Sequence, residues 1–180
     1  MKWKLVILAF GILLLFAAVY DWRTRPTQQD VIQKVFGNQQ NYDAFVSSQK
    51  VTAQLLHKQD EANSTKLKGY SSDAPISLSS EQIQKIKFLL QNPPSYLWNI
   101  GNSCIPDYGV LFTFHSDQRT VRVAVCFECD MLGVFDSEDN SAGQINSEYI
   151  IDPMHAQLVA LAKSIFPNDT TIQSLKEKRH

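Results

Sequence analysis

Two runs of alternating apolar and polar residues constrain the fold of this chain most. The runs cover residues 110–115 and 121–127, and a polar segment, residues 116–119, lies between them. A period of two is typical of strands that bury one face, and a short polar loop between two such strands predicts a β-hairpin. An apolar run at residues 131–135 predicts a third strand, which extends the hairpin into a meander.

The four-residue loop also sets which residues of the two strands face each other. Pairing outward from the loop gives a series of opposed residues: His115 with Thr120, Thr113 with Arg122, Leu111 with Ala124, and Gly109 with Cys126. Because side chains alternate along a strand, we expect Cys126 on the face opposite to Val121, Val123 and Val125.

Signals for helices and further strands flank the hairpin. Three signals predict helix starts: the capping pairs Thr27 with Asp30 and Ser79 with Gln82, and Asp152 as N-cap before Pro153. We expect a short helical stretch through Phe45, a strand at residues 50–57, a polar loop at residues 60–75 and a last helix at residues 169–177. This order favours an α+β fold, an antiparallel sheet with helices packed on one face, preceded by one N-terminal hydrophobic helix.

An apolar run at residues 5–20 has Lys2 and Lys4 before it and Arg23 and Arg25 after it. This pattern is typical of an export signal or a membrane span. The run lacks a good A-x-A cleavage site, which favours an uncleaved signal-anchor over a removed signal peptide. We expect residues 1–25 to be this targeting segment, held by the cell membrane. Residues 26–180 are then a single domain outside the cytoplasm; with the signal removed, they would be secreted or periplasmic.

Length and charge exclude some classes of protein. At 180 residues with 44% hydrophobic content, the chain can bury one core, and more than one domain is not expected. The first 25 residues hold four basic side chains and one acidic one, so the whole-chain charge of −1 leaves the remainder at −4. A mildly acidic domain does not attract phosphates, and nucleic acid is not an expected partner.

The chain has 3 cysteines, Cys104, Cys126 and Cys129, and the hairpin register brings them to its open end. His115 lies at the opposite end, about 20 Å away at roughly 3.3 Å per residue. The sequence leaves four interpretations open. In the first, Cys104 forms a structural disulfide with Cys126 or Cys129. In the second, the cysteines are buried apolar side chains without a bond between them. In the third, they bind zinc together with His155, and in the fourth they are a redox-active dithiol.

The residues Cys104, Pro106, Tyr108 and Gly109, followed by Cys126-Phe127-Glu128-Cys129, form a pattern that resembles a group of uncharacterised bacterial proteins. The resemblance covers roughly residues 48–175 and implies no activity, substrate or cofactor.

No catalytic or phosphate-binding motif accompanies the cysteines. The first hypothesis is therefore a non-enzymatic, membrane-tethered module outside the cytoplasm, with structural cysteines and an unidentified protein partner. A thiol- or zinc-dependent envelope enzyme is the second hypothesis, and an inhibitor or immunity-type envelope protein is the third.

Overall fold

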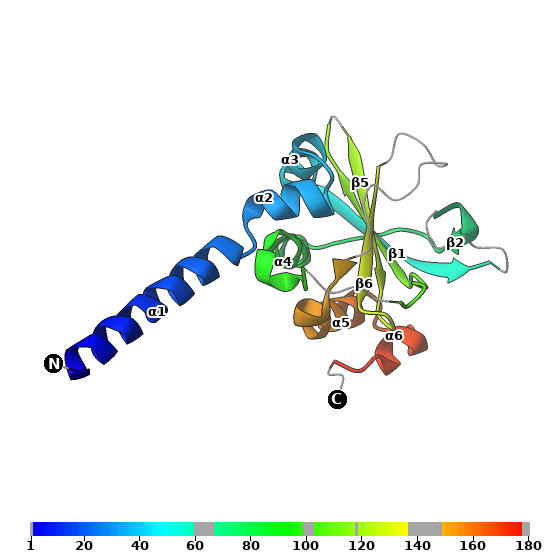
Figure 1. Cartoon of the computed structure of the whole chain (residues 1–180). Helices are drawn as coiled ribbons and strands as arrows, with labels where there is room; N and C mark the ends of the chain where they lie inside the picture. The colour runs from blue at the N-terminus through cyan, green and yellow to red at the C-terminus, as the bar shows by residue number, and fades with distance from the viewer. Residues whose placement is uncertain (1, 60–66, 99–102, 118, 137–148, 178–180) are drawn as a thin grey trace.

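A computed structural model describes residues 2–59, 67–98, 103–117, 119–136 and 149–177 (Figure 1). Within these ranges the chain is α+β, with a seven-stranded antiparallel sheet whose order is β2-β1-β4-β5-β6-β7, and β3 also pairs with β1. The strands are β1 (Lys50–Lys58), β2 (Tyr70–Ser72), β3 (Ile76–Ser77), β4 (Val110–His115), β5 (Thr120–Cys126), β6 (Met131–Asp136) and β7 (Tyr149–Ile150).

The predicted hairpin forms the centre of this sheet. β4 and β5 pair with His115 opposite Thr120 and Leu111 opposite Ala124, which confirms the register derived from the loop length. Ser116 closes the loop, because its backbone N–H donates to the Arg119 carbonyl at 3.1 Å and its hydroxyl donates to the same oxygen at 2.8 Å. β6 continues the meander, as predicted.

The helices are α1 (Lys2–Thr24), α2 (Gln28–Asp30), the π-helical turn η1 (Val31–Val35), α3 (Gln39–Ser47), α4 (Ser80–Gln91), α5 (His155–Ile165) and α6 (Thr170–Ser174). Capping boxes at Thr27 and at Ser79 are present where the sequence predicts them. Gly37 has a φ of 79° beyond η1, a left-handed conformation that glycine adopts without strain. Figure 1 shows α3, α4 and α5 on one side of the sheet.

Two apolar clusters lie on the two faces of the sheet. The larger one, which we call the inner-face cluster, lies between the helices and the inner face of the sheet. In it, Phe112, Phe114 and Val123 of the sheet and Leu158 of α5 are fully buried. The smaller one, which we call the outer-face cluster, consists of Leu56, Tyr108, Leu111, Ala124, Cys126, Cys129, Met131 and Phe135. The prediction that Cys126 points away from Val121, Val123 and Val125 is therefore confirmed.

Three sequence predictions need correction. Residues 60–75 are not all loop: 60–66 lie outside the described residues, but η2 (Leu67–Gly69) forms a 3-10 turn and β2 pairs with the end of β1. Asp152 is not an N-cap, since the chain enters α5 through a 3-10 turn, η4 (Asp152–Met154), which Ile151 precedes. The last helix ends at Ser174, because Leu175 leaves the helical conformation at its C-cap with ψ of 138°.

α1 extends away from the sheet and its helices in Figure 1, and none of its residues whose burial is described belongs to either apolar cluster. Among the residues that the structure describes, no helix has the length and apolarity needed to cross a membrane.

Candidate functional site

The candidate site is the region of the outer-face cluster where the three cysteines meet. Cys126 ends β5, Cys129 lies in the turn that leads to β6, and Cys104 precedes β4 in a segment without regular secondary structure. Antiparallel pairing of β4 with β5 places the start of one strand beside the end of the other. Strand pairing therefore brings together cysteines that are 25 residues apart in the sequence.

Cys104 and Cys129 form a disulfide, with a Cα–Cα distance of 5.9 Å, within the usual range for this bond. The bridge ties the segment before β4 to the turn between β5 and β6. The sulfur of Cys129 lies 3.5 Å from the carbonyl oxygen of Ile105, and that of Cys104 lies 3.9 Å from the same oxygen. Cys104 is exposed to solvent, whereas Cys129 is buried.

Cys126 is the free cysteine and has no solvent exposure. Its sulfur accepts backbone N–H groups from Asp107 at 3.3 Å and from Cys129 at 3.4 Å. Burial raises the pKa of the Cys126 thiol, and backbone N–H groups from Cys129, Asp107 and Glu128 act in the opposite direction because they stabilise a thiolate. The free sulfur is thus held by backbone donors from both segments that the disulfide joins.

The turn between β5 and β6 continues into a buried contact between a carboxylate and an imidazole. Asp130 has a φ of 52°, a conformation that aspartate tolerates in turns, and its carboxylate contacts Nδ1 of His155. On the other side of the ring, Nε2 of His155 lies 2.9 Å from the carbonyl oxygen of Lys176. The ring of Phe127 also meets the imidazole edge to face, at 6.3 Å.

The structure does not assemble the proposed zinc ligands. Cys104 and Cys129 are bonded to each other, and His155 is held by Asp130 and Lys176. Across the described part of the chain, no group of three or more His, Cys, Asp or Glu side chains is arranged to hold a metal ion. Sequence reasoning missed the contact between Asp130 and His155, because only the turn conformation and the docking of α5 bring these residues together.

A polar cleft of about 720 Å³ lies at the other end of β4, lined by Asp43, Ser47, Gln49, Lys50, His115, Ser116 and Asp117. His115 therefore lies far from the thiols, as the hairpin register predicts. Burial and the nearby charge of Lys50 lower the pKa of His115, and its Nε2 lies 3.4 Å from the hydroxyl of Thr52. This imidazole is therefore harder to protonate than a fully solvated histidine.

Comparisons with protein-family models, with curated proteins and with solved structures found no match to this chain. The site is therefore interpreted from its own geometry.

Proposed function

We propose that this protein is a membrane-tethered interaction module, held at the membrane by α1, with its α+β domain outside the cytoplasm. The observation that carries the proposal is the exposure of large apolar side chains along α1. They are Trp3, Ile7, Phe10, Ile12, Leu13, Leu14, Leu15, Phe16, Val19, Tyr20 and Trp22, each 47–79% exposed.

This exposure is unfavourable in water. Each fully exposed large apolar side chain forgoes about 1.5–3 kcal/mol of burial, and contiguous apolar patches of this kind on soluble proteins mark surfaces that bind other molecules. The apolar residues surround α1 instead of forming one stripe, which suits lipid better than a groove on a protein. Lipid contact along α1 is the simplest way to remove this surface from water.

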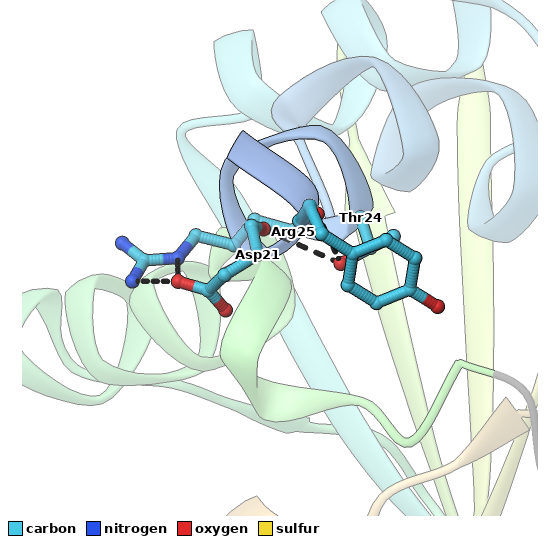
Figure 2. A network of polar contacts seen from close by, with 4 residues as sticks. Asp21, Thr24 and Arg25 are labelled. Carbon is cyan, nitrogen blue, oxygen red and sulfur yellow. Dashed lines mark hydrogen bonds and ion pairs between the residues drawn. The ribbon is translucent and has the colours of Figure 1, made fainter. Parts of the chain in front are cut away.

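The polar end of α1 supports the same proposal. Figure 2 shows Asp21 contacting the guanidinium of Arg25. The Thr24 hydroxyl donates to the Tyr20 carbonyl at 2.9 Å. A hydroxyl bonded to a carbonyl of the last turn and a basic side chain paired with a carboxylate suit a helix end that leaves an apolar environment. The domain starts directly afterwards, at the Thr27 cap.

Two features of the domain support the rest of the proposal. The disulfide between Cys104 and Cys129 suits an oxidising compartment.

Phe88 on α4 is 67% exposed, beside Lys87, whose amino group donates to the carbonyl of Val46 at 2.7 Å. Because Val46 is also exposed, the adjoining parts of α3 and α4 present apolar side chains that an unidentified protein partner would cover.

The test is the distribution of the full chain between membrane and soluble fractions after flotation of cell lysates. We expect the unaltered chain to float with membranes and the double variant Leu14→Lys/Phe16→Lys to remain largely in the soluble fraction. The matched control places the same two lysines at exposed polar positions of the domain, Gln40→Lys/Gln84→Lys, and should float normally.

Digestion of intact spheroplasts with a protease that does not cross membranes tests the side on which the domain lies. The proposal predicts loss of the domain without lysis. Recovery of the unaltered chain in the soluble fraction, or protection of the domain until lysis, would contradict it.

A further inference from the structure

The free thiol contacts one bridged residue and a residue close in sequence to the other. Its sulfur, on Cys126, accepts the N–H of Cys129, one of the bridged residues, and the N–H of Asp107, three residues after the other bridged residue, Cys104. Cys126 and Cys129 also have the C-x-x-C spacing that allows a disulfide between them. Cys129 therefore has two possible disulfide partners: Cys104, to which it is bonded, and Cys126, at the start of the same turn.

The three cysteine residues differ sharply in exposure. Cys126 has none and Cys129 is 5% exposed, whereas Cys104 lies at the surface beside Ile105, whose side chain is 75% exposed. In the present pairing the chain thus keeps its free thiol inside and one bridged sulfur in solvent. A disulfide between Cys126 and Cys129 would instead bury both bonded cysteines and leave the free thiol on the exposed Cys104.

We propose that Cys126 exchanges with the Cys104–Cys129 disulfide and thereby moves the free thiol from the interior to the exposed position of Cys104. The Cys126 thiolate attacks the sulfur of Cys129, and the Cys126–Cys129 bond forms as the Cys129–Cys104 bond breaks. Cys104 leaves as a thiolate and takes up a proton, which replaces the one lost from Cys126. One disulfide and one thiol are present before and after, so no oxidant or reductant is consumed.

Burial lowers the share of thiolate at Cys126, whereas other features of the surroundings favour this route. Backbone N–H groups around Cys126 stabilise the attacking thiolate, and the leaving thiolate of Cys104 reaches water directly. After protonation, the Cys104 thiol has an acceptor nearby, the Ile105 carbonyl oxygen, 3.9 Å away in the present structure. The exchanged form would release residues 104–107 from the turn and offer a surface thiol to small disulfides or to a disulfide of another protein.

The first experiment locates the free thiol. The full chain in detergent micelles is incubated without oxidant at pH 7 and pH 9, quenched in acid, unfolded and alkylated, and the labelled peptide is identified by mass spectrometry. We expect label at Cys126 initially and a growing share at Cys104, independent of protein concentration. The rate should rise about tenfold per pH unit below the pKa of the attacking thiol, which burial raises.

Label confined to Cys126 at both pH values would overturn the proposal. Exchange no faster than global unfolding, measured on the same sample, would also overturn it, because the folded geometry would then play no part. The variant Cys126→Ser is the matched control, and it should keep the Cys104–Cys129 bond and take up no label at either pH.

The second experiment asks whether the folded chain accepts the exchanged pairing. The variant Cys104→Ser leaves Cys126 and Cys129, and oxidised glutathione should convert them to an intramolecular disulfide. Two persisting free thiols, or a stable glutathione adduct, would contradict the proposal. Neither experiment depends on the membrane attachment of α1, so failure here would leave the proposed function standing.

Discussion

At the scale of single residues, His155 connects three parts of the molecule that are distant in sequence. Its ring contacts Asp130 in the β5–β6 turn, Phe127 beside it, and the carbonyl of Lys176 after α6. The side chains of Asp130 and His155 are only 8% and 7% exposed. Removing one member of this buried contact leaves the other polar group without its partner in a poorly solvated site, which costs more than the contact contributes.

We therefore expect His155→Leu to lower the free energy of unfolding by about 3 kcal/mol. The matched control is His57→Leu, because His57 pairs with Asp73 at 3.0 Å with both side chains 56% exposed. Breaking that surface pair should cost about 0.5 kcal/mol or less. Urea denaturation of the two variants measures the difference. Equal losses of unfolding free energy would show that the buried contact with Asp130 stabilises the fold no more than the exposed pair does.

At the scale of elements, the Thr27 capping box fixes where the domain begins. Asp30 accepts the backbone N–H of Thr27 at 2.8 Å and pairs with Lys34 at 2.9 Å. Lys34, followed by the Thr27 contacts, lowers the pKa of Asp30 from 3.8 to about 2. The turn that follows places Val31 and Phe36 in the inner-face cluster, so the cap stabilises a helix whose residues belong to the core.

The lowered pKa predicts a pH dependence. An acid whose pKa is lower in the folded state stabilises the fold above its unfolded pKa, and this contribution is lost as the pH falls. The Asp30 contribution should be complete above about pH 4 and disappear between pH 4 and pH 2. At neutral pH, Asp30→Asn should cost about 1–2 kcal/mol.

Chemical denaturation from pH 2 to pH 7 tests this expectation. The difference between Asp30→Asn and the unaltered chain should vanish near pH 2. Lys34→Gln, which removes the largest cause of the shift, should move the transition toward pH 4. A constant difference across the whole range would contradict the assignment.

At the scale of the whole molecule, the sheet brings distant segments together. β1 lies between β4 on one side and β2 and β3 on the other, although more than 50 residues separate β1 from β4 in the sequence. The Cys104–Cys129 disulfide closes a loop across the meander, with a sequence separation of 25. A cross-link of this kind stabilises a fold mainly by restricting the unfolded chain.

We expect the double variant Cys104→Ser/Cys129→Ser to lose about 3 kcal/mol of unfolding free energy. The unaltered chain, measured in a reducing buffer, is the control and should lose a similar amount. Guanidinium denaturation under oxidising and reducing conditions provides the comparison. If reduction leaves the midpoint of the unaltered chain unchanged, the disulfide does not contribute to the stability of the domain.

The sequence by itself determined the features that depend on neighbouring residues. The loop at Ser116 set the register of the hairpin, because strand pairing follows directly from loop length. The caps at Thr27 and Ser79 set two helix starts, since each is satisfied within three residues. These interactions join residues that are close in sequence, so short sequence patterns predict them.

Only the tertiary structure decided how the distant parts combine. It placed β1 beside β4, added short strands at Tyr70, Ile76 and Tyr149, and brought His155 into contact with the carboxylate of Asp130. It also paired Cys104 with Cys129 and left Cys126 buried, a choice that the sequence left open. The physical reason is that these contacts depend on how helices and strands dock across the sheet, and several arrangements satisfy the same apolar pattern.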